Sequence, residues 1–127
     1  MNRILVVDDD QESRDLLREV LEANGYAVEA AADGLAARDS IRRDGDSRII
    51  IADMRMPNES GLELLRKLRQ GPAKHEMILM SSFFSGAEKK AAKELGVYAL
   101  LVKPFRLSEL LQAVAELAAR NPVRIPL

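Results

Sequence analysis

Residues 49–53 read IIIAD, a run of four apolar residues that ends on an acid. Two other runs have the same form: residues 4–9 read ILVVDD, and residues 100–104 read LLVKP. Such short apolar runs are typical of strands that are buried on both faces of a parallel sheet. Parallel strands end at one edge of their sheet, where open α/β sheets bind ligands. The runs therefore place four charged side chains together at that edge: Asp8, Asp9, Asp53 and Lys103.

Apolar runs alternate with helical patterns five times along the chain. We expect strands over residues 3–7, 26–31, 49–53, 77–81 and 97–102. We expect helices over residues 11–23, 35–43, 61–69, 87–95 and 107–119. This alternation favours an α/β fold with a doubly wound parallel sheet that helices cover on both faces.

The bulk composition fits one domain. The chain has 127 residues, 47% of them hydrophobic, which is enough for a core of this size. The net charge of -1 gives no reason to expect direct binding of nucleic acid. Cysteine is absent, which excludes disulfides and thiolate chemistry, and no apolar run approaches the roughly 18 residues that span a membrane. We expect a cytoplasmic protein with a domain over residues 1–120 and a tail or linker over residues 121–127.

Local signals mark several element ends. Asp10 is a candidate N-cap for the first helix, and Gly25 is a candidate stop after it. Ser60 and Glu63 have the spacing of a capping box that opens the third helix. His75 is the only histidine and stands in a polar stretch, so we expect it in a surface loop.

The acids at the predicted edge indicate a bound cation. Clustered carboxylates repel one another and do not all stay ionised without a positive charge between them. Mg2+ prefers a few carboxylate ligands together with water molecules. The simplest cofactor for Asp8, Asp9 and Asp53 is therefore Mg2+.

Five segments, in this order and spacing, resemble the receiver domain of response regulators, the phospho-acceptor module of two-component signalling. They are residues 4–10 (ILVVDDD), 33–34 (DG), 53–65 (DMRMPNESGLELL), 77–82 (MILMSS) and 96–105, which end in LVKPF. The similarity covers residues 3 to 119. It implies a flavodoxin-like fold with five parallel strands in the order 2-1-3-4-5 and five helices.

The resemblance also implies how the site works. Asp53 aligns with the aspartate that takes a phosphoryl group from a histidine kinase or a phosphotransfer protein. Asp8 and Asp9 align with the acidic pair that holds Mg2+, and the main-chain carbonyl of Arg55 aligns with a further metal ligand. Such a domain phosphorylates itself and slowly loses the group again, so it is not an enzyme that turns over a substrate.

Two further residues read the phosphoryl group in the family. Ser81 aligns with the hydroxyl that hydrogen-bonds it, and Lys103 aligns with the lysine that pairs with it. The resemblance implies a signal that passes through the fourth helix, the fifth strand and the fifth helix. It also implies an output domain or partner protein, a monomer or a phosphorylation-dependent dimer, and no membrane contact.

One position departs from the family pattern. Leu100 stands where receivers usually carry a switch tyrosine or phenylalanine. Tyr98 lies two residues earlier and is expected to point to the same face as Leu100. We expect either that Leu100 repacks on activation or that Phe83 or Phe84 takes the role of the aromatic residue.

Two other functions are compatible with parts of the pattern. A pseudo-receiver would keep the fold as a protein-interaction module without phosphorylation, but the intact acids and Lys103 argue against it. A phosphatase with an aspartate nucleophile would need a second acid two residues after Asp53, where this chain has Arg55.

Overall fold

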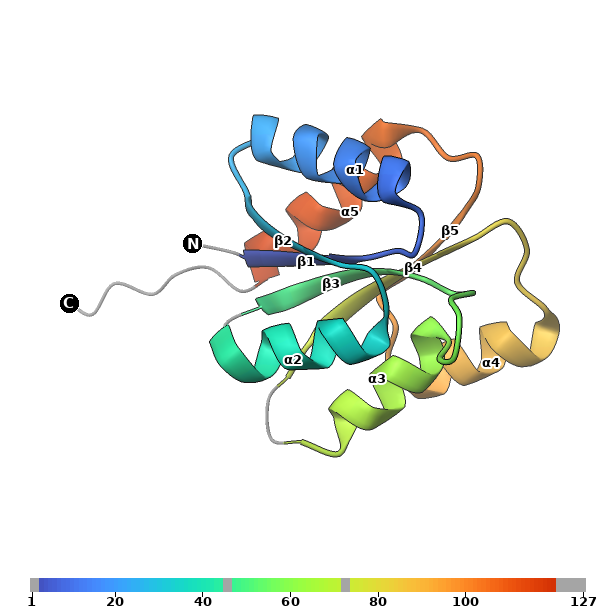
Figure 1. Cartoon of the computed structure of the whole chain (residues 1–127). Helices are drawn as coiled ribbons and strands as arrows, with labels where there is room; N and C mark the ends of the chain where they lie inside the picture. The colour runs from blue at the N-terminus through green and yellow to red at the C-terminus, as the bar shows by residue number, and fades with distance from the viewer. Residues whose placement is uncertain (1–2, 45–46, 72–73, 121–127) are drawn as a thin grey trace.

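A five-stranded parallel sheet forms the middle layer of the molecule, in the order β2-β1-β3-β4-β5 (Figure 1). The computed structural model describes residues 3–44, 47–71 and 74–120. The strands are β1 (Arg3–Val7), β2 (Ala27–Ala31), β3 (Ser47–Asp53), β4 (Glu76–Ser81) and β5 (Ala99–Val102). The predicted doubly wound sheet and its strand order are confirmed.

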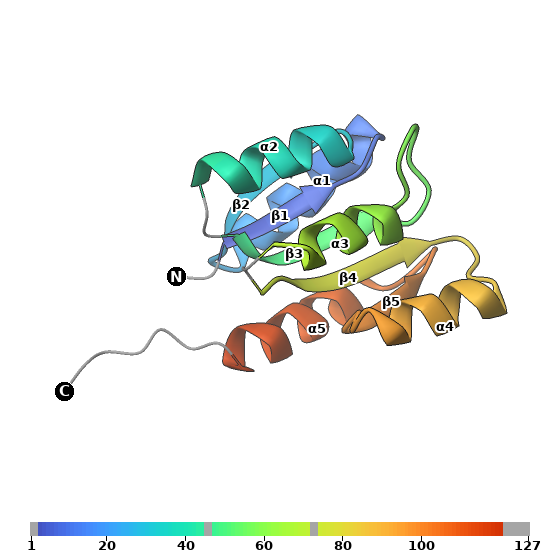
Figure 2. The same ribbon diagram turned by 90° about the horizontal axis from the view of Figure 1, so that it is seen from below.

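Helices cover both faces of the sheet. The helices on one face are α1 (Gln11–Ala23) and α5 (Leu107–Arg120) (Figure 1). The helices on the other face are α2 (Gly34–Asp44), α3 (Gly61–Arg69) and α4 (Gly86–Glu94), and α2 and α3 lie side by side (Figure 2). Within the described residues, no helix is long and apolar enough to cross a membrane.

The alternation of side chains along β1 shows why its sequence is apolar throughout. Leu5 and Val7 join the core beneath α2, α3 and α4, whereas Ile4 and Val6 join the core beneath α1 and α5. All four side chains are completely buried. A strand that is covered on both faces has no polar side, so the run ends only where the chain leaves the sheet at Asp8.

The local signals that open and close helices are largely confirmed. Asp10 is the N-cap residue of α1, but its carboxylate accepts from Ser13 Oγ at 2.8 Å and caps no backbone amide. Gly25 follows α1 with a φ of 91°, which favours glycine. Ser60 and Glu63 form the predicted capping box of α3.

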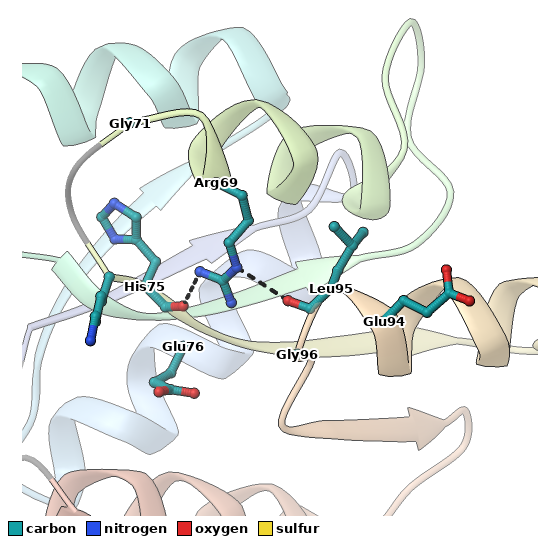
Figure 3. A pocket seen from close by; sticks show the side chains of 8 residues that line it. Arg69, Gly71, His75, Glu76, Glu94, Leu95 and Gly96 are labelled. Carbon is teal, nitrogen blue, oxygen red and sulfur yellow. Dashed lines mark hydrogen bonds between the residues drawn. The ribbon is translucent and has the colours of Figure 1, made fainter.

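Two sequence predictions about the edges of the sheet are wrong. His75 is buried and not exposed in a loop, because β4 begins directly after it at Glu76. Its carbonyl accepts a hydrogen bond from Arg69 Nη1 at 2.7 Å (Figure 3). Tyr98 packs with the α1 and α5 core whereas Leu100 packs with the other core, because β5 begins only at Ala99 and the strand alternation does not extend back to Tyr98. The predicted tail, residues 121–127, lies outside the described residues.

The loop between β3 and α3 is fixed by a buried acid. Glu59 accepts from Lys67 Nζ at 2.6 Å and forms an ion pair with Arg38, so it joins this loop to α2 and α3. Burial raises the pKa of Glu59, but the hydrogen bonds from Lys67 and Arg38 outweigh it and hold the pKa below its usual value of 4.5. The ionised form of Glu59 therefore stabilises the folded state.

We predict that Glu59→Gln lowers the free energy of unfolding by about 1–2 kcal/mol at pH 7, because two cations lose their partner. A depressed folded-state pKa contributes stability above the unfolded pKa, and this contribution disappears as the pH falls through the folded value. The difference from the wild type therefore narrows below about pH 4.

Urea unfolding of both proteins between pH 3 and pH 7 measures this difference. Glu19→Gln, an exposed charge change on α1, serves as the control and should leave the free energy of unfolding within about 0.5 kcal/mol of the wild type. A Glu59→Gln effect that stays constant over the whole pH range would contradict the ionised pairing.

Candidate functional site

The predicted charged residues meet at the edge where the strands end. Asp8 follows β1, Asp53 is the last residue of β3, and Lys103 follows β5. Main-chain hydrogen bonds continue past the strand ends, from Met54 N to Met80 O at 2.7 Å and from Lys103 N to Ser81 O at 2.8 Å. The sheet thus holds the backbone of each site residue in register, and the side chains converge on one point.

Three carboxylates form a cluster at this edge. Asp8, Asp9 and Asp53 each offer an oxygen atom, and these atoms lie within 4.8 Å of one another. Asp8 and Asp53 are buried, whereas Asp9 is exposed. Burial raises the pKa of Asp8, the amide of Asp10 lowers it, and the nearby Asp53 and Asp9 carboxylates raise it again. The net direction is upward, so the ionised form of Asp8 is costly in the folded protein.

The donor atoms of this cluster fit a magnesium ion. Asp8 Oδ1 accepts from the Asp10 amide at 2.9 Å, but Asp8 Oδ2 is buried and has no hydrogen-bond partner among the described residues. A buried carboxylate oxygen without a donor is unfavourable unless a ligand satisfies it. Mg2+ binds oxygen ligands and offsets the repulsion between acids, so Asp8, Asp9 and Asp53 fit it in both respects.

The backbone amide of Arg55 lies next to the carboxylate of Asp53. The Arg55 amide donates to Asp53 Oδ1 at 3.3 Å, because the chain turns immediately after β3. The turn brings the main chain of Arg55 to the acidic cluster. The site therefore also contains the residue whose carbonyl is the predicted further metal ligand.

Lys103 is paired with the central acid. Its Nζ donates to Asp53 Oδ2 at 3.0 Å, and the Lys103–Pro104 peptide bond is cis. The two side chains come from strands on opposite sides of β4 and meet only because all strands end at the same edge. A single ammonium group faces three carboxylates here, so the cluster keeps an excess of negative charge.

Ser81 lies at the same sheet edge, at the end of β4, and its hydroxyl is hydrogen-bonded to groups other than Asp53. Its hydroxyl is buried, donates to the carbonyl of Phe83 at 2.8 Å and accepts from Arg55 Nη1 at 2.8 Å. A hydroxyl group can donate one hydrogen bond, and here Ser81 donates it to the Phe83 carbonyl. The Ser81 hydroxyl must release this carbonyl before it can donate to a group on Asp53.

The structure places two further charged groups near the site that the sequence analysis missed: the guanidinium of Arg55 and the carboxylate of Glu88. Arg55 Nη2 and Glu88 Oε1 lie 3.2 Å apart, which links the loop after β3 to the first turn of α4. Ser85 and Glu88 also form a capping box, and their spacing in the sequence was a signal that could have pointed to Glu88.

Leu100, which stands where receivers usually carry an aromatic residue, has a defined place in the packing. Leu100 is partly buried and packs against the core beneath α4, to which the buried Phe84 also belongs. Phe83 is 64% exposed, and its backbone carbonyl, not its ring, contacts Ser81. A relay through Leu100, Phe83 or Phe84 stays a prediction.

Gly61 brings the first turn of α3 against the backbone of Asp53. Its amide donates to Met54 O at 3.0 Å. A Cβ atom at Gly61 would lie 2.8 Å from the carbonyl oxygen of Asp53 and 2.6 Å from Leu79 Cδ2. Only a residue without a side chain permits this approach, so Gly61 helps to fix the position of Asp53.

Comparisons with known proteins agree on one family. The family model described as Response regulator receiver domain matches residues 4–115. The response regulator MprA of Mycobacterium avium is 40% identical over 119 residues, which make up 94% of this chain and 52% of that protein. MprA of Mycobacterium leprae is 38% identical over the same length. The chain spans about half the length of the curated relatives it matches.

Solved structures show the same similarity. The chemotaxis protein CheY4 of Vibrio cholerae superposes with a TM-score of 0.85 and is 30% identical, covering 91% of this chain and 98% of that one. A CheY-like response regulator receiver domain protein of Methanospirillum hungatei superposes with a TM-score of 0.88 at 28% identity, covering 94% and 95% of the two chains. Sequence and structure thus point to the same family.

We predict that Gly61→Ala destabilises the protein by about 1–3 kcal/mol, because the new methyl group overlaps backbone atoms that cannot move freely. Gly86→Ala is the matched control: Gly86 also follows a capping serine at the start of a helix, and a Cβ atom there meets nothing within 4 Å. Urea unfolding should show Gly86→Ala unchanged or slightly stabilised. Equal destabilisation by both variants would contradict the close packing at Asp53.

We predict that Asp8→Asn stabilises the protein by about 1 kcal/mol in magnesium-free buffer, because it removes a buried repelling charge. The same change should weaken Mg2+ binding by about tenfold or more, because an ionised ligand is lost. Thermal unfolding and calorimetric titration with MgCl2 measure the two effects. The control is Asp10→Asn, which alters the exposed neighbouring acid and should change neither the stability nor the affinity for Mg2+. An equal response of both variants would argue against a metal role of Asp8.

Proposed function

The chain belongs to the family of response regulator receiver domains, and on this basis we propose that it is a phospho-acceptor switch of two-component signalling. In this proposal Asp53 accepts a phosphoryl group from a phosphohistidine of a histidine kinase or a phosphotransfer protein. The supporting observation is the convergence of Lys103, Asp8 and Asp9 on Asp53 at one edge of the sheet.

The chemistry requires an ionised and well-placed carboxylate. One oxygen of Asp53 attacks phosphorus, the bond between phosphorus and the donor nitrogen breaks, and the leaving imidazole keeps its electron pair. The product is an acyl phosphate on Asp53. The ammonium group of Lys103, 3.0 Å from Asp53 Oδ2, stabilises the negative charge that gathers there.

A metal ion would be held by Asp8, Asp9, Asp53 and the carbonyl of Arg55. When bound, Mg2+ would supply the positive charge that lets an anionic phosphoryl donor approach an anionic acceptor. The residues of the chain set the position of this charge: the sheet fixes Asp8 and Asp53, and the exposed Asp9 leaves room for water ligands.

Phosphorylation would then change the partners of Ser81. The modified Asp53 carries about 1.5 to 2 negative charges, where the free carboxylate carries one, and this charge favours donors that point at it. Ser81 would release the Phe83 carbonyl and donate to the phosphoryl group, and the segment between β4 and α4 would move with it. Conversion from mostly inactive to mostly active needs a differential of about 5 kcal/mol, which charge-assisted hydrogen bonds can approach.

The length of the relatives supports an output domain or a partner protein as the recipient of the signal. The MprA regulators are about twice as long as the part that this chain matches. In this proposal the recipient would bind the face formed by α4, β5 and α5. The domain would act as a monomer or as a phosphorylation-dependent dimer. Its own chemistry would be limited to self-phosphorylation and slow loss of the group.

Incubation with acetyl phosphate and MgCl2, followed by intact-mass analysis, tests the proposal. We expect the mass of one phosphoryl group on the wild type and none on Asp53→Asn, which keeps the shape of the side chain but removes the nucleophile. Asp33→Asn, a change of an acid in the loop after β2, is the control and should still be phosphorylated.

Two outcomes would overturn the assignment. Phosphorylation that persists in Asp53→Asn would place the acceptor elsewhere. A wild type that takes up no phosphoryl group from acetyl phosphate or from a phosphorylated kinase would instead favour the pseudo-receiver, an interaction module that works without phosphorylation.

A further inference from the structure

The guanidinium group of Arg55 connects the phosphorylation site to α4. Nη1 donates to Ser81 Oγ at 2.8 Å and to the carbonyl of Phe83 at 3.1 Å, and Nη2 lies 3.2 Å from Glu88 Oε1. The side chain of Arg55 thus contacts the hydroxyl of Ser81, the loop between β4 and α4, and the first turn of α4.

The helix at the far end of this connection has few other anchors. Only Ala92 is buried among the nine residues of α4, whereas α3, of the same length, buries five. Three lysines of α4, Lys89, Lys90 and Lys93, are exposed. Because little apolar surface holds α4 against the sheet, polar contacts at its ends have a large share in setting its position.

A second arginine holds the other end of α4. Arg69 Nε donates to the carbonyl of Leu95 at 3.1 Å, and its Nη1 donates to the carbonyl of His75 at 2.7 Å (Figure 3). Both acceptors are main-chain groups: Leu95 is the C-cap residue of α4, and His75 precedes β4. This contact lies at the opposite end of β4 from Ser81, so a charge added at Asp53 does not compete for it.

The Arg55 contact, in contrast, lies next to the place where charge would be added. Asp8, Asp9, the phosphoryl group and Mg2+ together would leave about two negative charges, of which Lys103 neutralises one. The guanidinium of Arg55 donates to the hydroxyl of Ser81, the group that is proposed to donate to the phosphoryl group. Guanidinium groups bind phosphate oxygens through two parallel hydrogen bonds, which makes the phosphoryl group a stronger acceptor than the partly exposed Glu88 carboxylate.

We propose that the side chain of Arg55 links the phosphorylation site to α4 and exchanges hydrogen-bond partners on phosphorylation. In the unmodified protein it holds Ser81, Phe83 and Glu88. In the phosphorylated protein it leaves Glu88 for the phosphoryl group, so the N-terminal end of α4 is freed while Arg69 holds the C-terminal end. This inference rests on the proposed phosphorylation of Asp53, and it gives the switch a polar link to α4 that needs no aromatic residue at Leu100.

Freeing Arg55 does not by itself unravel α4. Glu88 Oε1 also accepts from the Ser85 amide at 2.8 Å, and the Glu88 amide donates to Ser85 Oγ at 3.1 Å. The capping box therefore stays intact when Arg55 leaves. The expected change is a displacement of the first turn of α4 as a unit.

A double-mutant cycle tests the contact between Arg55 and Glu88. The variants are Arg55→Gln, Glu88→Gln and their combination, and the coupling is measured by urea unfolding without any phosphoryl group. We expect the pair to couple by about twofold to fivefold in the unfolding equilibrium constant, as a partly exposed ion pair does. Arg66→Gln with Glu94→Gln, which changes two exposed residues of α3 and α4, serves as the matched control cycle and should show no coupling.

The same cycle is then repeated with beryllium fluoride and MgCl2, which together mimic the phosphoryl group on Asp53. We expect the coupling between Arg55 and Glu88 to disappear. Hydrogen exchange should locate the change: in the wild type, the mimic should alter exchange at residues 86–90 and leave residues 93–98 as they were.

Each outcome decides a separate point. Absence of coupling in the unmodified protein would show that Arg55 does not hold Glu88. Coupling that persists with the mimic bound would refute the exchange of partners. If the mimic does not bind and intact-mass analysis shows no phosphorylation, the proposed function fails and the exchange fails with it, while the first cycle still decides whether Arg55 anchors α4.

Discussion

Repulsion between three carboxylates at the end of the sheet is the constraint on which the rest of the site depends. The strands gather Asp8, Asp9 and Asp53 within 4.8 Å, and Lys103 offers only one opposing charge. Such a cluster costs stability, as the raised pKa of Asp8 and its unpaired buried oxygen both indicate. The fold tolerates this cost because the apolar cores on both faces of the sheet stabilise it. In the proposed function this imbalance favours a bound cation, and the charge of the cation then allows an anionic phosphoryl group to approach.

The hydrogen bonds around Ser81 show how a change of charge can reach the surface. Ser81 and Arg55 share the carbonyl of Phe83 as an acceptor, and Arg55 also reaches Glu88 in α4. All of these contacts are polar, so a new anion at Asp53 competes with them directly. A switch built in this way depends on an exchange of hydrogen bonds, which is consistent with the aliphatic side chain at Leu100.

The sequence predicts the architecture where one physical rule dominates. Apolar runs that end on Asp8 and Asp53 identify buried strands, and the spacing of Ser60 and Glu63 identifies a helix start. Ser81 is a candidate only through its resemblance to the receiver family, since nothing local distinguishes this hydroxyl. The burial of His75 and the face of Tyr98 depend on where β4 and β5 begin, which tertiary packing decides. The contact between Arg55 and Glu88 joins residues 33 positions apart, and no sequence period reports such a pair.

In the proposed function, the acidic cluster holds a cation and an acyl phosphate on Asp53 as one coupled unit. A calorimetric titration of the protein with MgCl2, with and without beryllium fluoride, measures this coupling. Binding free energies are reciprocal, so a shared site requires each ligand to strengthen the other. We predict that Mg2+ binds at least tenfold more tightly when the phosphoryl mimic is present. Equal affinity for Mg2+ under both conditions would contradict it.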